Sequence, residues 1–124
     1  MKLWIDDVRP APDGYVWCKS VHTARNWILG VEDKIRTCNF KLRRLIYLGE
    51  ADILKEEIKD NTIELIDIDH DAGDFACDGG DYIRLLDWLE ETGRNYPIRI
   101  HSMNLVGAAN MRAIIQRNGW TEIR

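Results

Sequence analysis

The 124-residue sequence has few cysteines, and it contains no apolar run long enough to span a membrane. Its three cysteines, Cys18, Cys38 and Cys77, are odd in number and widely spaced, with no CxxC or histidine pairing that would indicate a zinc site. The N-terminus, MKLWIDDVRP, turns acidic after Ile5 and so lacks the apolar segment of a signal peptide. We therefore expect a cytoplasmic protein with reduced thiols.

Positive charge is also scarce. The sequence has 17 Lys and Arg against 21 Asp and Glu, which gives a net charge of −4. Proteins that hold nucleic acid along a broad surface rely on clustered Lys and Arg. The densest basic run, KLRRL at residues 41–45, is typical of a solvated face and receives no functional role. A broad duplex-binding surface is thus excluded, whereas a small phosphate-bearing ligand in a local site is not.

The composition is that of one globular domain. Apolar residues make up 45% of the chain and charged residues 31%, so neither disorder nor a membrane protein is indicated. Single domains cluster at about 100 to 150 residues, a length that can bury well over half of the unfolded surface. We expect a single domain over residues 1–124.

Short apolar strands alternate with helical patterns along the chain. The apolar runs predict strands at residues 2–6, 15–19, 44–48, 62–69, 97–102 and 120–124. Apolar spacings of three and four predict helices at residues 20–30, 50–60, 82–91 and 104–119. Strands separated by helices indicate crossover units, so we predict an α/β fold with a doubly wound, mainly parallel sheet, in three layers with helices on both faces.

Polar residues and glycines mark the ends of these helices. Ser20 and Asp81 are the expected N-caps, and Asn104 begins the last helix. Gly30, Gly93 and Gly119 are the expected stops. The first helix should bury its apolar stripe, Val21, Ala24, Trp27 and Ile28. The RPAPDG segment at residues 9–14 predicts a turn, because two prolines and an Asp-Gly pair continue neither a strand nor a helix.

Polar side chains gather at the ends of three predicted strands. They are Asp6 and Asp7 after the first, Asp69, His70 and Asp71 after the central one, and His101, Ser102 and Asn104 after a later one. In open α/β sheets the functional crevice lies beyond the carboxyl ends of the strands. The three strand ends should therefore supply one common pocket.

The carboxylates of this pocket predict a metal site. Clustered acidic groups repel one another unless a cation or proton lies between them, and hard oxygen ligands favour Mg²⁺, with Mn²⁺ as the alternative. Asp6, Asp7 and Asp69 are the predicted ligands. Another interpretation pairs Asp7 with Arg9 and leaves the other carboxylates as solvated turn residues.

The remaining polar groups suit proton transfer and phosphate binding. His70 and His101, on facing strand ends, are candidates for a catalytic base and acid, with Asp69 as the third catalytic candidate. Ser102 and Asn104 fall where a helix begins, and free amides at a helix N-terminus attract phosphate. Two further carboxylates, Asp67 and Asp71, are expected to contact the site residues without contacting the metal or substrate. For Asp67 the alternative is burial against a partner that has only a structural role.

The motifs LWIDDVRPAPDGYVWCKS, IDIDHDAG, GGDYIRLLDWLE and IRIHSMNLVGAANMRAII together resemble the family of cyclic-phosphate processing receiver domains. The resemblance covers most of the chain except residues 32–60, which are expected to be an insertion or a diverged segment. It implies a receiver-like, flavodoxin-like fold and the handling of cyclic phosphates on nucleotides or at RNA 3′ ends.

Receiver motifs carry over to individual positions of this sequence. By this resemblance Asp6 and Asp7 match the acidic pair of receivers, Asp69 the aspartate that signalling receivers phosphorylate, and Ser102 their switch hydroxyl. Two departures stand out. No lysine follows Lys59, although signalling receivers carry one after their last strand, and Leu105 stands where the family often has proline.

Two functions are compatible with these residues. In the first, a divalent ion and the two histidines hydrolyse a cyclic phosphodiester, such as a 2′,3′-cyclic phosphate, to a phosphomonoester. In the second, the domain is a receiver-like signalling module or a cyclic-nucleotide or phosphate sensor without turnover. The missing lysine counts against phosphotransfer, and any protein partner stays unidentified.

Overall fold

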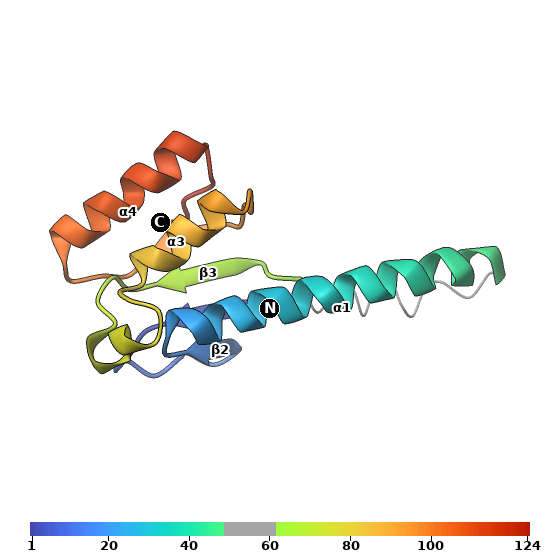
Figure 1. Cartoon of the computed structure of the whole chain (residues 1–124), viewed down its shortest axis with the longest axis horizontal. Coiled ribbons are helices and arrows are strands. Elements are labelled where there is room, and N and C mark those ends of the chain that lie inside the picture. The colour runs from blue at the N-terminus through green and yellow to red at the C-terminus, as the bar shows by residue number, and fades with distance from the viewer. Residues whose placement is uncertain (49–61) are drawn as a thin grey trace.

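The computed structural model describes residues 1–48 and 62–124, which form an α/β fold around a four-stranded parallel sheet (Figure 1). The strands are β1 (Lys2–Ile5), β2 (Tyr15–Cys18), β3 (Leu65–Ile68) and β4 (Ile98–Ile100), in the order β2-β1-β3-β4. This is the order of flavodoxin-like folds, so the predicted α/β class and the parallel sheet are confirmed. The strand predicted at residues 120–124 is reduced to one bridge between Ile98 and Glu122.

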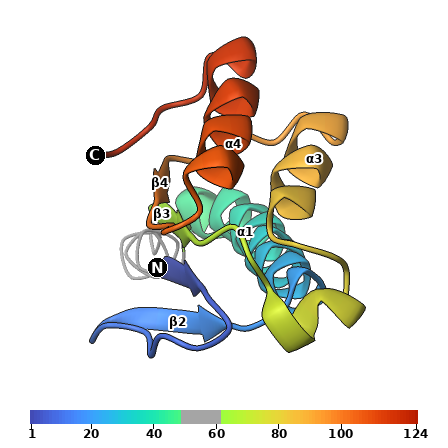
Figure 2. The same cartoon turned by 90° about the vertical axis from the view of Figure 1, so that its left-hand side faces the viewer.

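In the described residues, three α-helices pack on one face of this sheet (Figure 2), so they do not form the predicted three layers with helices on both faces. They are α1 (Val21–Leu48), α3 (Ile83–Glu91) and α4 (Leu105–Asn118), and a short 3-10 helix, η1 (Gly73–Cys77), precedes α3. The register pairs Leu3 with Ile66 and Ile5 with Ile68, so alternation brings these side chains to the same face. They are buried against apolar side chains of all three helices, including Ala24, Ile28, Leu86, Leu89, Met111 and Ile115.

The connection between β1 and β2, residues 6–14, contains no helix. Parallel neighbours are usually joined by a crossover of a dozen or more residues that includes a helix. Here the predicted turn alone joins the two strands, and it carries Asp6 and Asp7 at its start. The sheet face opposite the three helices therefore presents aromatic residues, among them Trp4 and Tyr15, whose rings meet edge to face with centroids 5.9 Å apart.

Helix α1 is longer than the sequence pattern indicates. The predicted stop near Gly30 and the predicted strand at residues 44–48 are wrong, because α1 runs from Val21 through to Leu48. Gly30 has no neighbour within 4 Å of an added Cβ and no left-handed φ angle, so it lies in the helix without ending it. Glu32 then accepts hydrogen bonds from Arg94 and Tyr96, which fasten the next turn of α1 to the segment after α3.

Two other sequence expectations can be compared with the helices, and a third cannot. Val21, Ala24 and Ile28 are buried as predicted, but Trp27 is 41% exposed. Asp81 does not cap α3, because its Oδ1 accepts a hydrogen bond from the Ala72 backbone N–H at 3.0 Å and so closes the preceding loop. The helix predicted at residues 50–60 lies outside the described residues.

The predicted start of α1 and both predicted ends of α4 are confirmed. Ser20 Oγ accepts from the Thr23 N–H at 3.1 Å, and Asn104 Oδ1 accepts from the Gly107 N–H at 2.9 Å. Gly119 ends α4 with a φ of 66°, the left-handed conformation that glycine adopts most easily. None of the described helices combines the length and apolar content that a membrane crossing requires.

Two glycine variants test the continuity of α1 at Gly30 and the left-handed end of α4 at Gly119. Gly30→Ala should raise the free energy of unfolding by about 0.5 to 1 kcal/mol, because alanine is the better residue in a helix interior with open space around it. Gly119→Ala should lower it by about 1 kcal/mol or more, because a left-handed conformation is costly for alanine. Urea unfolding monitored by circular dichroism measures both. Destabilisation by Gly30→Ala would contradict a continuous helix.

Candidate metal and phosphate site

Three carboxylates meet at the carboxyl ends of β1 and β3. Asp6, Asp7 and Asp69 each offer an oxygen, and these oxygens lie within 4.8 Å of one another. The register that pairs Ile5 with Ile68 places the residues after the two strands side by side. Asp6 is 1% exposed and Asp69 8%, so the cluster is largely withdrawn from water. The structure thus brings the three predicted metal ligands together.

Asp6 is held in its ionised form. Its burial opposes ionisation, but hydrogen bonds from the backbone N–H groups of Arg9 and Val8, together with His101, outweigh that effect and lower the pKa of Asp6. The two backbone bonds, at 2.9 and 3.0 Å, end on Asp6 Oδ1. A carboxylate that accepts several N–H groups stays charged even when buried.

The pKa of Asp7 is shifted in the opposite direction from that of Asp6. Burial raises the pKa of Asp7, and the negative charges of Asp6 and Asp69 raise it further. Gly73 faces this carboxylate so closely that an added Cβ would stand 2.4 Å from Asp7 Oδ2, and its φ is +53°. Glycine at this position therefore lets the backbone of η1 approach the acidic cluster. Repulsion from its two charged neighbours therefore opposes the ionisation of Asp7.

Arg9 places a positive charge beside the cluster. Its Nε lies 3.6 Å from Asp6 Oδ2, and its Nη2 lies 3.9 Å from Asp69 Oδ2. The sequence offers Asp7 as a structural partner of Arg9, whereas these two ion pairs are with Asp6 and Asp69. The Arg9 side chain is 46% exposed, so it can turn toward solvent or a ligand. In the sequence, the position of Arg9 two residues after Asp7 is the signal that a positive charge lies near the acidic pair.

The donor set fits a divalent cation. Three carboxylate oxygens of this spacing are the hard ligands that Mg²⁺ and Mn²⁺ take, and Asp6 and Asp69 come from rigid strand ends. The raised pKa of Asp7 shows that the third negative charge is costly without a neighbouring cation. A buried acidic cluster that could bind a divalent metal is therefore present.

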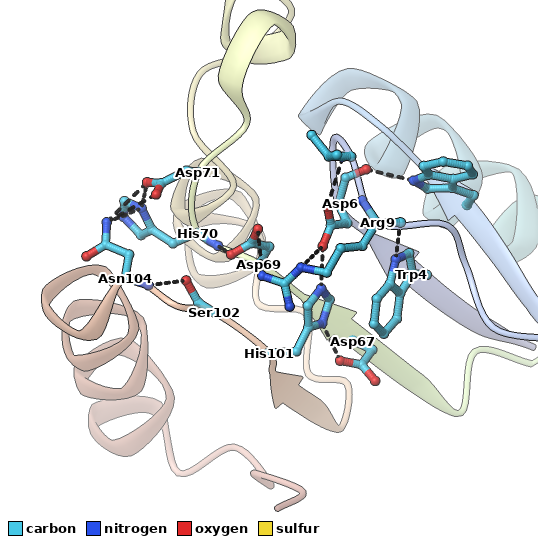
Figure 3. Close-up of polar contacts among 12 residues, drawn as sticks. Trp4, Asp6, Arg9, Asp67, Asp69, His70, Asp71, His101, Ser102 and Asn104 are labelled. Atoms are coloured by element: carbon cyan, nitrogen blue, oxygen red, sulfur yellow. Dashed lines mark hydrogen bonds and ion pairs between the residues drawn. The ribbon is translucent and has the colours of Figure 1, made fainter.

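His101 is fixed between two carboxylates (Figure 3). Its Nε2 lies 2.9 Å from Asp6 Oδ2, and its Nδ1 lies 2.6 Å from Asp67 Oδ1. Trp4 stacks on the imidazole with ring centroids 3.8 Å apart and planes 4° apart. Arg99 lies 3.4 Å from the second oxygen of Asp67. Asp67 thus reaches the acidic cluster through His101 and does not enter it.

His70 belongs to a separate group. Its Nδ1 lies 2.7 Å from Asp71 Oδ1, and Asn104 Nδ2 donates to the same oxygen at 3.1 Å. These two hydrogen bonds, that from His70 first, lower the pKa of Asp71. The imidazole packs on Gly107, where an added Cβ would stand 2.4 Å from its Cγ. Figure 3 shows Asp69 between this group and the Asp6–His101 group, so the two histidines do not face each other as a pair.

Ser102 and Asn104 build the start of α4. Ser102 Oγ accepts from the Asn104 N–H at 3.1 Å, and Asn104 caps Gly107. The N–H groups of the first helical turn, at Leu105 and Val106, have no carbonyl one turn earlier to bond. These amides lie at the same sheet edge as the carboxylates. The predicted phosphate-binding residues therefore shape a helix N-terminus that suits an anion.

Two tryptophans missed by the sequence argument brace the acidic loop. Trp17 Nε1 donates to the carbonyl of Asp6 at 2.7 Å, and Trp4 Nε1 donates to the carbonyl of Arg9 at 2.8 Å. Both indoles come from neighbouring strands, β2 and β1. The apolar strand pattern around each tryptophan contained no signal of these bonds, because the acceptors are backbone carbonyls of a loop.

An Asp7→Asn variant tests whether the cluster is strained. Because the folded protein raises the pKa of Asp7, ionised Asp7 opposes folding at neutral pH, and this penalty fades as pH falls through the folded-state pKa. In chelator, Asp7→Asn should therefore raise Tm by roughly 4 °C, equivalent to about 1 kcal/mol. Adding Mg²⁺ should raise Tm of the parent protein and have less effect on the variant.

Differential scanning calorimetry with chelator or Mg²⁺ makes this comparison, with Asp13→Asn as the control. Asp13 is exposed in the same connection and should show neither effect. A lower Tm for Asp7→Asn in chelator, or equal Mg²⁺ stabilisation of both proteins, would contradict the assignment.

Comparison with known proteins agrees with the motifs and the strand order. The family model described as cyclic-phosphate processing receiver domain matches residues 1–117. Searches of curated proteins and of solved structures gave no match. The match spans all four strands, every residue of the site, and the described helices except the last residue of α4. The chain therefore belongs to the family of cyclic-phosphate processing receiver domains.

Proposed function

We propose that this domain hydrolyses cyclic phosphodiesters with the help of a divalent metal ion, and that its substrates are 2′,3′-cyclic phosphates of nucleotides or RNA 3′ ends. The observation that carries the proposal is the cluster of three carboxylates whose oxygens lie within 4.8 Å of one another. The N-terminus of α4 and His70, which is hydrogen-bonded to Asp71, lie at the same sheet edge. Family membership supports the handling of a cyclic phosphate.

The metal ligands in this proposal are Asp6, Asp7 and Asp69, and the ion is Mg²⁺, with Mn²⁺ as the alternative. When bound, the ion supplies positive charge that neutralises phosphate oxygens. Arg9 provides a second, mobile positive charge next to Asp6 and Asp69. A phosphodiester can therefore bind in a protein whose net charge is −4, because the charge that matters is local.

The N-terminus of α4 provides the remaining phosphate contacts. The first-turn amides of Leu105 and Val106 point out of the helix start, and Asn104 and Ser102 hold that start in place. Amide groups bind phosphate oxygens without the flexibility of lysine. This fits a site in a chain that has no lysine after Lys59.

His70 is the proton-transfer residue that the geometry favours. Asp71 accepts the hydrogen of Nδ1, which leaves the lone pair on Nε2, and no hydrogen bond from Nε2 occurs within residues 1–48 and 62–124. Water adds to phosphorus and gives a proton to the base, one P–O bond of the ring breaks, and the freed oxygen takes up a proton. The product is a phosphomonoester.

His101 has a different role in this proposal. Its two ring nitrogens already face Asp6 and Asp67, and Trp4 covers one face of the ring. An imidazole held on both nitrogens is suited to orient a metal ligand. We therefore assign the placement of Asp6 to His101 and proton transfer to His70.

The second candidate function is a receiver-like sensor that accepts a phosphoryl group at Asp69 or binds a cyclic nucleotide without turnover. Arg9 favours this alternative, because it puts a cation beside Asp69 in a chain that lacks the usual receiver lysine. The same assay separates the two functions.

The first functional test is a product assay by chromatography with 2′,3′-cyclic and 3′,5′-cyclic nucleotides, in Mg²⁺, Mn²⁺ or chelator. We expect metal-dependent opening of the 2′,3′ ring that Asp69→Asn abolishes. Asp33→Asn is the matched control, because Asp33 is 74% exposed on α1 and should leave turnover unchanged. Absence of ring opening, together with a phosphoryl adduct from acetyl phosphate that Asp69→Asn removes, would favour the sensor.

Two histidine variants test the division of roles. His70→Ala should lower kcat by about 100-fold or more, the usual contribution of a general acid or base, with little change in the Mg²⁺ concentration at half-maximal activity. His101→Ala should instead raise that Mg²⁺ concentration by about tenfold, as expected for a residue behind a metal ligand. His22→Ala, exposed on α1, is the control. The reverse pattern of kcat and Mg²⁺ effects would contradict the assignment.

A further inference from the structure

A hollow lies at the carboxyl end of β2, the strand next to β1, which Asp6 follows. Its volume is about 380 Å³, and it is lined by Trp17, Lys19, Ser20, Thr23, Phe75 and Asp78. Small-molecule sites in proteins occupy about 300 to 1,000 Å³ and combine apolar walls with a few polar groups. This hollow has that size and composition, and neither the metal site nor the helix N-terminus of α4 uses it.

Both aromatic walls of the hollow are tied to the metal ligands. Trp17 donates its indole N–H to the Asp6 carbonyl at 2.7 Å. Phe75 belongs to η1, and Gly73 at the start of η1 contacts the Asp7 carboxylate. The hollow is therefore connected to the acidic cluster through Trp17 on one side and through η1 on the other.

Both aromatic rings face the exposed side chain of Lys19. The Lys19 ammonium lies 4.5 Å from the Trp17 ring centroid and 5.9 Å from the Phe75 centroid. Lys19 is exposed, so its ammonium can move aside and leave these ring faces to a ligand. Phe75 is itself 36% exposed, although it is one of only two phenylalanines in the chain.

The polar wall offers hydrogen bonds at a fixed position. Ser20 Oγ lies 2.6 Å from Asp78 Oδ2 and 2.9 Å from Thr23 Oγ1. The backbone bond from the His22 N–H to the Asp78 carbonyl fastens this wall to the start of α1. Hydroxyl and carboxylate groups at the edge of an aromatic slot match the donors and acceptors at the edge of a nucleobase.

We propose that this hollow binds the nucleobase of the substrate, stacked on Phe75 and Trp17, while the cyclic phosphate lies at Asp6, Asp7 and Asp69. The inference rests on the proposed function, and it names a nucleotide as the substrate. Neighbouring strands are about 4.8 Å apart, so the end of β2 lies one strand from Asp6. That separation suits the short distance between the phosphate and the base of a single nucleotide.

The experiment compares a substrate with a base and one without. The kcat/KM is measured for adenosine 2′,3′-cyclic phosphate and for glycerol 1,2-cyclic phosphate, which has the same five-membered ring and no base. In Phe75→Ala the ratio of the two kcat/KM values should fall by about tenfold toward the base-free substrate, the size of a lost base–aromatic stack. Phe40→Ala, at a phenylalanine 76% exposed on α1, should keep the parent ratio.

A binding measurement keeps this inference independent of turnover. Adenosine, which has no phosphate, is titrated while the five tryptophan indole N–H signals are followed by NMR, with the Trp17 signal assigned from Trp17→Phe. We expect the Trp17 signal to shift in the parent protein and in Phe40→Ala, and to shift much less in Phe75→Ala.

The outcomes separate the two proposals. Adenosine binding at Trp17 without ring opening would overturn the hydrolase and retain the nucleobase site. Ring opening of both substrates at a ratio that Phe75→Ala does not change, with no adenosine-dependent shift at Trp17, would overturn the nucleobase site and retain the hydrolase.

Discussion

The repulsion among Asp6, Asp7 and Asp69 is the constraint on which the rest of the site depends. Two of these carboxylates are almost fully buried, and burial alone would drive them toward the neutral form. The protein offsets this cost with backbone N–H groups from the loop after β1, with His101, and with Arg9. Asp7 has fewer compensating contacts, which is why its pKa is raised while that of Asp6 is lowered.

The helix-free connection between β1 and β2 allows this compensation. A crossover helix after β1 would carry the chain away from the sheet edge, whereas the short turn keeps Asp6, Asp7 and Arg9 above it. The same connection leaves the indoles of Trp4 and Trp17 near its backbone, and both donate to its carbonyls. The loop is therefore held from the strand side by tryptophans and from the sheet edge by His101, so the carboxylate geometry is preorganised.

The receiver-like scaffold is kept, but the surroundings of its acidic centre have changed. The acidic pair and the central aspartate occupy the ends of β1 and β3, and Arg9 is the cation beside them. Around this centre lie two histidine groups, one oriented by Asp71 and one by Asp67. Each is a histidine with a carboxylate partner, yet only His70 leaves a ring nitrogen without a second carboxylate. Because their partners differ, His70 suits proton transfer, whereas His101 suits the placement of Asp6.

The sequence by itself determined the local elements and the composition of the site. Four of the six predicted strands, and the helix ends at Ser20, Asn104 and Gly119, were indicated correctly because these signals act within a few residues. The parallel order then placed Asp6, Asp7 and Asp69 together. Only the tertiary structure decided that α1 continues past Gly30, that Arg9 pairs with Asp6 and Asp69, and that His70 and His101 lie in separate groups. These features depend on contacts between distant parts of the chain, such as Asp6 with His101, 95 residues apart, and no local pattern encodes such a pairing.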